Sequence, residues 1–333
     1  MSDIKYAHAV SRLRAMETKL LDRAKINRMI DSNTAEEVFK MLQETDFNTL
    51  MGNVKRPEEY EIILSEDLKR LYSLMYSISP DKTLIDIMSV RYDYHNIKVI
   101  IKENALKADL NYLLIPVGTV QVEKLKYFIA EKNYYDLDPI MREAIEKVEA
   151  AFELEKDPQK IDIILDYYMY KDMLSRANTI GDKYLLNFLK INIDLSNLKT
   201  LLRVKKQNKS KEFLETVLLD GGAIDRDTLI SMLNESNESI INRLSHTDYS
   251  EILRVGIEEF AASGRLNAFE KLSDNFIMEY IKNAKYVSFG VEPLLAFMFA
   301  KENEIKLVRI IMVGKLNNIN AEVIRERLRD IYV

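Results

Sequence analysis

The hydrophobic positions of this chain recur at helical spacing from one end to the other. Between Ile4 and Leu21, for example, apolar residues fall three and four positions apart, as on one face of an α-helix. No segment bounded by turn residues alternates apolar and polar side chains in the manner of a strand. The pattern therefore predicts an all-α protein.

Capping residues and prolines mark where the expected helices begin and end. Thr34-Ala35-Glu36-Glu37 fits a capping box, so a helix is expected to begin at about Ala35. Pro57 suits the first turn of a long helix that should run to about Ser77, before Ser79-Pro80-Asp81 breaks it. The next helix is expected to end near Ala108.

The second half of the chain carries similar signals. Asp157-Pro158 is a helix N-cap followed by proline at the first helical position, and Gly181 should separate that helix from the next. Pro293 is expected to begin a further helix and Gly314 to end it. Few glycines and prolines, 9 and 6 in 333 residues, also favour long helices.

One seven-residue pattern occurs twice, and a fainter third copy follows near the C-terminus. The copies read N-I-K-V-I-I-K at 96–102, N-L-K-T-L-L-R at 197–203 and K-L-V-R-I-I-M at 306–312. In the first two copies an aspartate, Asp93 or Asp194, stands three residues before the asparagine. The separations of 101 and 109 residues exceed the roughly 20–50 residues of solenoid repeats. We therefore expect three helical repeat units, at 1–110, 111–220 and 221–333.

Related segments follow each copy and support this division. Val117-Gly118-Thr119-Val120 follows the first copy and Gly221-Gly222-Ala223-Ile224 the second, and a shorter connection follows the third. Each is expected to lead into a short helix with an apolar residue at the matching place, namely Leu125, Leu229 and Ile324. A second similarity links residues 42–47 to residues 244–249.

Composition removes several classes of function. The net charge of −5 argues against a nucleic-acid-binding protein whose affinity comes from neutralising phosphates. No apolar run approaches the roughly 18 residues that a membrane span requires, and the N-terminus does not look like a signal peptide. The absence of cysteine excludes disulfides and thiolate chemistry. We expect a cytoplasmic protein.

The sequence offers no local signature of catalysis or cofactor binding. It has no phosphate-binding G-x-x-x-x-G-K-[ST] loop, no G-x-G-x-x-G and no H-E-x-x-H. His95, close to Asp93, resembles half of a metal site, but the matching residue of the second copy is Ser196. We therefore predict no catalytic, cofactor-binding or metal-binding residue, although a site assembled in space from distant residues stays open.

Polar residues beside the apolar face of the repeated helix are the candidates for partner binding. They recur in the first two copies, and basic residues stand near the matching place in the third. Either they form a surface where the repeat units meet and contact a partner, or they are the solvated edge of amphipathic helices. The candidates are Asn96, Lys98, Asn197, Lys199, Arg203, Lys306 and Arg309.

Several longer motifs resemble one known family over nearly the whole chain. The C-terminal run Arg309–Asn317, the helix Ile324-Arg325-Glu326-Arg327-Leu328, the pattern at 197–203 and the N-terminal run Tyr6–Glu17 are similar to the C/d subunit of rotary V-type and archaeal-type ATPases. Asn318 and Asn320 depart from the glycine and proline usual in that family.

This resemblance implies a non-catalytic subunit of a rotary motor. Members of the family fold as three similar helical units around a pseudo-threefold axis and form a funnel. The partners implied are the central shaft, a coiled-coil subunit with its small companion, and the membrane ring of proteolipid subunits. The resemblance implies a peripheral position on the cytoplasmic face of the membrane and no cofactor, nucleic acid or small-molecule substrate. It leaves open whether the motor moves protons or sodium ions.

A cavity on the axis would give the candidate residues a role, because polar edges of repeated helices could converge there. We expect these residues, apart from Arg203, to face or flank such a cavity. Two alternatives remain: a helical adaptor that binds a soluble partner, and an all-α enzyme whose site is assembled in space. Co-purification with proteolipid would argue against the adaptor, and a deep pocket with shifted titratable groups would favour the enzyme.

Overall fold

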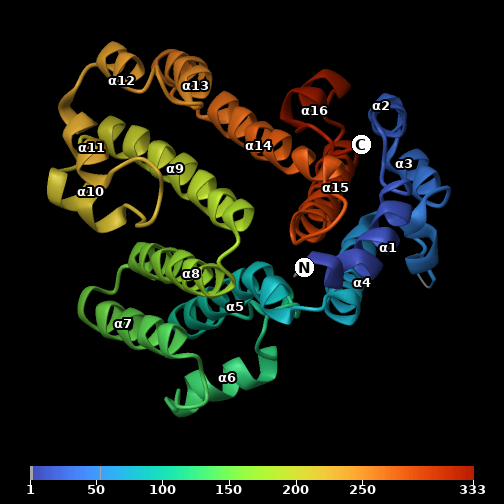
Figure 1. Cartoon of the computed structure of the whole chain (residues 1–333), viewed down its shortest axis with the longest axis horizontal. Coiled ribbons are helices and arrows are strands. Elements are labelled where there is room, and N and C mark those ends of the chain that lie inside the picture. Colours follow the sequence, from blue (N-terminus) through green and yellow to red (C-terminus); the bar gives the residue numbers. More distant parts are fainter. Residues whose placement is uncertain (1–2, 53) are drawn as a thin grey trace. The chain divides into compact units, whose positions relative to one another are not determined.

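The structure is a computed structural model that describes residues 3–52 and 54–333, and over these ranges it contains helices and no strand (Figure 1). The predicted all-α class is confirmed. Backbone contacts divide the chain into two compact units. The terminal unit joins the N-terminal part, up to Pro80, to Glu251–Val333, and the middle unit is Asp81–Ser250. This division differs from the expected repeat boundaries near 110 and 220, and the three-unit organisation stays a prediction.

The terminal unit combines helices from both ends of the chain. Its N-terminal elements are η1 (Asp3–Tyr6), α1 (Ala7–Glu17), α2 (Arg23–Asp31), α3 (Ala35–Leu42), η2 (Asp46–Leu50), η3 (Pro57–Glu59) and α4 (Tyr60–Ile78). Its C-terminal elements are α13 (Ser250–Ser263), α14 (Asn267–Lys282), η6 (Asn283–Tyr286), α15 (Glu292–Leu316) and α16 (Ala321–Arg327).

The middle unit is continuous in sequence. It contains α5 (Lys82–Leu106), η4 (Asn111–Leu113), α6 (Val122–Glu131), α7 (Pro139–Glu155), α8 (Pro158–Ile180), α9 (Lys183–Lys206), α10 (Lys211–Val217), α11 (Arg226–Ser231), η5 (Met232–Asn234) and α12 (Asn237–Arg243).

Most predicted helix boundaries agree with the structure because capping groups occupy them. The Thr34 hydroxyl accepts a hydrogen bond from the backbone N–H of Glu37 at the start of α3. Asp157 caps α8 in the same way, and Gly181 ends that helix with a left-handed φ of 70°.

Gly314 does not end the helix that follows Pro293, so that prediction is wrong. Helix α15 continues to Leu316, and Gly314 lies buried within it. A Cβ atom at this position would lie 2.6 Å from Cδ1 of Ile324 on α16. The glycine therefore allows α16 to pack closely against α15 rather than interrupting the helix.

The three copies of the repeated pattern occupy the same place in three long helices. Asn96, Asn197 and Lys306 each lie fourteen residues after the first residue of their helix, α5, α9 and α15 respectively. The short helices that follow also share a register. Leu125, Leu229 and Ile324 each stand three residues after the first residue of α6, α11 or α16, and all three side chains are buried.

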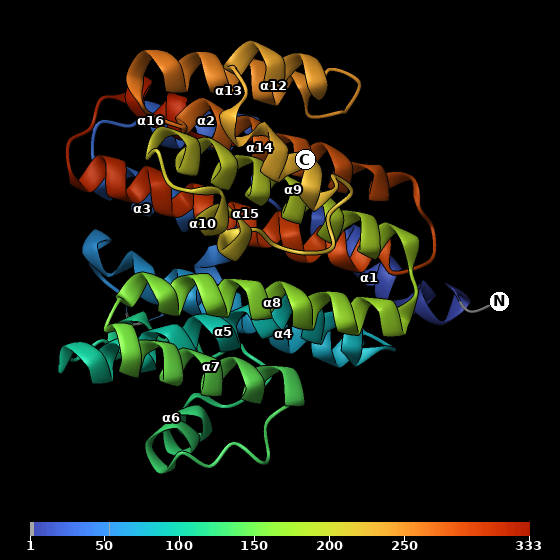
Figure 2. The same cartoon turned by 90° about the vertical axis from the view of Figure 1, so that its left-hand side faces the viewer.

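Each compact unit contains the same kind of helix pairing. In the middle unit α5 packs against α8, the helix that precedes the next long helix, and α7 covers α8 as well (Figure 2). In the terminal unit α15 packs against α4, the helix that precedes the first long helix. The last long helix thus pairs with the helix that precedes the first long helix.

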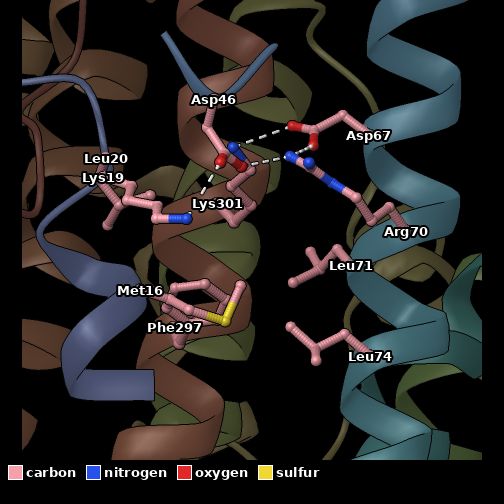
Figure 3. A pocket seen from close by; sticks show the side chains of 10 residues that line it. All are labelled: Met16, Lys19, Leu20, Asp46, Asp67, Arg70, Leu71, Leu74, Phe297 and Lys301. Atoms are coloured by element: carbon pink, nitrogen blue, oxygen red, sulfur yellow. Dashed lines mark hydrogen bonds and ion pairs between the residues drawn. The ribbon is translucent and has the colours of Figure 1, made fainter. Parts of the chain in front are cut away.

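A buried cluster of charges ties the N-terminal segments to α15 in the terminal unit (Figure 3). Lys301 Nζ lies 3.0 Å from Asp67 Oδ2 on α4 and also pairs with Glu304. The same ammonium group lies 4.6 Å from the ring centroid of Phe47, and Glu304 accepts the backbone N–H of Leu21 at 2.6 Å. One lysine therefore joins α4, η2 and α15, and through Glu304 the segment after α1.

The space beside this cluster is too small for a ligand. Its volume of about 30 Å³ is comparable to that of a water molecule or two. Apolar side chains also line it: Met16, Leu20, Leu71, Leu74 and Phe297. The pocket is therefore a packing feature of the terminal unit.

Replacing Lys301 by methionine is expected to lower the free energy of unfolding by about 3–5 kcal/mol, because Glu304 would stay buried without its cation and Asp67 would keep only Arg70. Chemical denaturation followed by circular dichroism measures this. The control is Lys306→Met on the same helix, whose exposed pair with Asp274 should be worth less than about 1 kcal/mol. Equal losses in the two variants would contradict the assigned role of the cluster.

Candidate partner-binding site

The two asparagines of the repeated pattern are buried in the middle unit and hold the backbone of a loop. Asn96 Nδ2 donates to the carbonyl of Ile115 at 2.8 Å, and its Oδ1 accepts the N–H of Ile115 at 2.8 Å. Asn197 makes the same two bonds with Leu219, at 2.9 and 2.8 Å. A side-chain amide thus satisfies both polar groups of one backbone position in the loop after its helix.

The aspartates one turn earlier hold the next part of the same loops. Asp93 accepts the backbone N–H groups of residues 119 and 120, at 2.7 and 3.0 Å. Asp194 accepts those of residues 223 and 224, at 3.1 and 3.0 Å, and the hydroxyl of Tyr249 at 2.9 Å. We call each Asp–Asn pair with its bound loop a loop clamp.

A glycine at the same place in each loop makes the clamp sterically feasible. A Cβ atom on Gly118 would lie 2.0 Å from Oδ1 of Asp93, and one on Gly222 would lie 2.2 Å from Oδ1 of Asp194. Neither distance is tolerable for a carbon and an oxygen that are not bonded. The glycines of the two related segments are therefore required by the approach of a carboxylate to the backbone.

Burial of the clamp carboxylates opposes their ionisation. Burial raises the pKa of Asp93 to about 6, although the N–H and hydroxyl groups that it accepts favour the charged form. Burial likewise raises the pKa of Asp194, against hydrogen bonds from the loop backbone and Tyr249.

The third copy uses different side chains. Asn303, which stands where the other copies have aspartate, donates from Nδ2 to the carbonyl of Asp330 at 3.0 Å. Lys315, further along α15, donates to the carbonyls of Ile30 and Ser32, each at 2.6 Å. The last long helix therefore holds segments from both ends of the chain.

Basic residues of the long helices pair with acidic residues on the neighbouring helix. Lys98 and Lys102 of α5 bind Asp166 and Asp162 of α8, with N–O distances of 2.6 and 2.7 Å. On α15, Lys306 binds Asp274 of α14 at 2.7 Å, and Arg309 binds Glu61 of α4 at 2.6 Å. These half-exposed pairs connect helices within a unit.

Lys199 and Arg203, which match Lys98 and Lys102 in register, line a groove. The groove has a volume of about 630 Å³ and lies between α8 and α9, which diverge from their shared turn (Figure 1). Asp162 and Asp166 stand on its α8 side. Its apolar lining includes Ile163, Met169, Val204, Phe213, Val217 and Leu219.

The groove has the composition of a protein-binding surface. Apolar side chains lie between a basic edge on α9 and an acidic edge on α8, and the acidic edge is already paired with lysines of α5. An amphipathic helix can place its apolar face in such a groove and charged residues at the rim. Leu219, which Asn197 holds, belongs to the lining, so the second loop clamp positions part of the groove wall.

Comparison with known proteins places the chain in a family. It matches the family described as ATP synthase (C/AC39) subunit over residues 9–327. The chain belongs to this family. The resemblance to the C/d family of rotary ATPases is thus confirmed for nearly the whole sequence.

Individual relatives in the ATP synthase C/AC39 family match along most of their length. The chain is 29% identical to the C subunit of the V-type sodium ATPase of Enterococcus hirae over 320 residues, covering 96% of this chain and 97% of that protein. It is 31% identical to the C subunit of the A-type ATP synthase of Methanocaldococcus jannaschii, covering 97% and 86%. Among the described residues of this family member, no helix is both long and apolar enough to cross a bilayer.

The seven predicted partner-binding residues of this family member fall into three groups. Asn96 and Asn197 are buried in loop clamps, where their amides are committed to backbone groups. Lys199 and Arg203 come together in the groove. The other three, Lys98, Lys306 and Arg309, form ion pairs with acidic residues of a neighbouring helix. Contact of these residues with a partner stays a prediction.

Sequence reasoning missed the apolar part of the groove and the buried charges. Phe213 and Val217 lie on α10, whose place beside α8 and α9 no local pattern indicates. Asp67 could have been noticed, because it falls on the helix face that carries Ile63, Leu64 and Leu71. A charged residue on an apolar face signals a buried partner.

Replacing Asn197 by leucine is expected to lower the free energy of unfolding by about 2–4 kcal/mol, because both backbone groups of Leu219 lose their partner. Asn187→Leu, an exposed position on the same helix, serves as the matched control and should change stability by less than about 0.5 kcal/mol. Denaturant unfolding measures both variants. Equal free energies of unfolding for the two variants would contradict the stabilising role assigned to the second loop clamp.

The Asp93 carboxyl is expected to titrate near pH 6 when followed by carbon NMR. Because its folded pKa lies above the ordinary value of 3.8, the folded protein binds a proton that the unfolded chain releases between these values. The stability contributed by this group is therefore present below about pH 4 and is lost as the pH rises through 6. Asp93→Asn should remove this component of the pH dependence. A midpoint below pH 4 would contradict the prediction.

Proposed function

We propose that this chain is a non-catalytic central-stalk component of a V/A-type rotary ATPase. It couples the rotating shaft to the membrane ring of proteolipid subunits during ATP-linked proton or sodium-ion transport. The observation that carries the proposal is family membership over residues 9–327, since relatives are named as the C subunit of a V-type ATPase and of A-type ATP synthases.

The repeat structure supports an arrangement of three helical units around a pseudo-threefold axis. The three pattern copies share one register in α5, α9 and α15. In a closed ring of units, each long helix would pack against the helix that precedes the next long helix. Two such pairings occur within the compact units: α5 with α8, and α15 with α4. Because the second pairing joins the last long helix to the helix before the first, it favours a closed funnel over an open row of repeats.

The groove between α8 and α9 is the best-supported seat for the shaft. A coiled-coil shaft presents amphipathic helices, and the groove offers apolar side chains between charged edges. Lys199 and Arg203 would then contact the partner directly. Asn197 would act by positioning Leu219, and Lys98 by holding the α8 wall through Asp166. Asn96 would hold a loop and Lys306 and Arg309 would link helices in the same way in the other repeat units.

The internal ties of the chain suit the transmission of torque. Loop clamps fix the segments after α5 and α9, and the Lys301 cluster fixes the N-terminal helices to α15. A close-packed helical body of this kind deforms little, so load applied at one contact is passed to another rather than absorbed. In this role the chain rests on the cytoplasmic face of the membrane as a peripheral subunit.

Reversing both basic residues of the groove, Lys199→Glu with Arg203→Glu, is expected to weaken capture of the purified shaft subunits at least about tenfold at low salt. The difference from the unmodified protein should shrink as salt increases, because exposed charge contacts are screened. A pull-down at two ionic strengths measures both effects.

The matched control is Lys107→Glu with Lys124→Glu, which reverses two exposed lysines of the middle unit outside the groove. This control should capture the shaft as well as the unmodified protein. An unmodified chain that captures no shaft subunit would overturn the proposed function. Equal weakening by the two double variants would remove the groove from the proposal.

A further inference from the structure

The two loop clamps differ in the source of a third hydrogen bond. In the first clamp the hydroxyl that Asp93 accepts, at 2.7 Å, belongs to Thr119 of the loop itself. The second loop has Ala223 at the matching place, and alanine has no hydroxyl. The hydroxyl that Asp194 accepts, at 2.9 Å, comes instead from Tyr249, 55 residues further along the chain. The second clamp therefore takes from a distant segment a donor that the first takes from its own loop.

The segment that carries Tyr249 is an ordered turn at the end of the middle unit. It follows α12, and the middle unit ends at Ser250, the first residue of α13. The hydroxyl of Thr247 donates to the carbonyl of Leu244 at 2.7 Å, and the N–H of Ser250 donates to the carbonyl of Thr247 at 3.2 Å. The Tyr249 side chain is buried. We call residues 244–250 the exit segment, because the chain leaves the middle unit there.

A related segment of the terminal unit, residues 42–47, shows what is particular to the exit segment. Thr45 and Thr247 each donate from the hydroxyl to the carbonyl three residues earlier, at 2.7 Å. Phe47 stands in place of the tyrosine and lies against the ammonium group of Lys301 in α15. Each aromatic ring thus meets a polar side chain of a long helix, but only the tyrosine has a hydroxyl to donate.

The loop of the second clamp, residues 219–224, contacts both walls of the groove. Leu219 lines the groove, and the clamp asparagine of α9 holds both of its backbone groups. Asp220 accepts the hydroxyl of Tyr167, on the α8 wall, at 2.9 Å. A Cβ atom on Gly221 would overlap Cδ1 of Leu174, also on α8. The loop is therefore packed between the two helices, and its displacement would shift the groove lining.

Hydrogen bonds connect the exit segment to the groove without a break. Tyr249 donates to Asp194, and Asp194 accepts the N–H groups of residues 223 and 224. The other end of the same short loop is Leu219, in the groove wall. A close-packed segment that is fixed at both ends passes on a displacement rather than absorbing it. Such coupling is reciprocal, so occupancy of the groove would also affect the exit segment.

We propose that Tyr249 is a positioning residue that couples the exit segment to the groove. Its hydroxyl, bonded to Asp194, keeps the loop at 219–224 in the conformation that binds a partner, and a partner in the groove makes the exit segment more ordered. The identity of that partner, the shaft, rests on the proposed function. The connection itself lies within the middle unit.

Hydrogen exchange of the full chain, followed by NMR, tests the connection without any partner. Tyr249→Phe keeps the ring and removes the hydroxyl, so the amides of residues 219, 223 and 224 should exchange about tenfold faster, the factor that a hydrogen bond to a charged group is worth. The matched control is Tyr94→Phe, which removes another buried hydroxyl that donates to a carboxylate, that of Asp172. This control should leave the three amides unchanged.

A second variant separates a positioning role from a merely structural one. Tyr249→Phe with Ala223→Thr gives the second loop its own hydroxyl, as Thr119 does in the first loop, at a residue that is exposed. Exchange of the amides of residues 219, 223 and 224 should return to within about twofold of the unmodified chain, because Asp194 regains its third donor. The loop of this double variant is then ordered but no longer joined to the exit segment.

Purified shaft subunits supply the functional readout. Tyr249→Phe should weaken their capture about three- to tenfold, and Ala223→Thr in addition should restore it. Shaft binding should slow exchange of the Thr247 and Ser250 amides at least about threefold in the unmodified chain, and not in the double variant.

The other outcomes separate this inference from the proposed function. Unchanged exchange at residues 219, 223 and 224 in Tyr249→Phe would overturn the coupling and leave the family function standing. So would a shaft that binds the unmodified chain without slowing the exit-segment amides, or that slows them equally in the double variant. If the unmodified chain captured no shaft subunit, the proposed function would fall and the coupling to the shaft with it. Faster exchange in free Tyr249→Phe would then show that the partner, and not the internal connection, was at fault.

Discussion

A polar side chain placed in the buried middle of a long helix must find partners, and this requirement organises the middle unit. The helix backbone has no hydrogen-bonding groups to spare, so the carboxylate and amide take N–H and C=O groups from the loop that follows. The loop in turn must bring its backbone close enough, which requires glycine opposite the carboxylate. The carboxylate and the glycine therefore depend on each other. This dependence appears twice, as Asp93 with Gly118 and as Asp194 with Gly222.

The third copy of the pattern, in α15, meets the same requirement with different side chains. Its long helix has Asn303 and Lys306 where the others have aspartate and asparagine. Asn303 bonds to Asp330, and Lys315 of the same helix holds the carbonyls of Ile30 and Ser32, far away in the sequence. Glu304 and Lys301 extend this role by joining α15 to the segment after α1 and to α4. Helix α15 is thus an attachment point for segments from the beginning of the chain.

The sequence predicted the helices and the family, because each of these depends on local spacing or on motifs several residues long. It singled out Asn96 and Asn197 but did not predict their bonds to a loop, since a polar residue beside an apolar face has the same spacing whether it faces solvent or a buried loop. The groove required knowledge of where α10 lies, which only tertiary packing determines. Gly314 was misjudged because close packing by Ile324, a residue ten positions later, outweighs the usual tendency of glycine to end a helix.

The composition of the terminal unit from both ends of the chain has a consequence for biosynthesis. The middle unit, Asp81–Ser250, can become compact while the ribosome is still translating, because all of its segments have emerged by then. The first 80 residues cannot, since α4 packs against α15, which is made only after the middle unit. The nascent N-terminal helices must therefore wait, exposed to chaperones and proteases, for about the time needed to add two hundred residues. A premature stop between Ser250 and α15 would release a chain with a finished middle unit and an unfinished beginning.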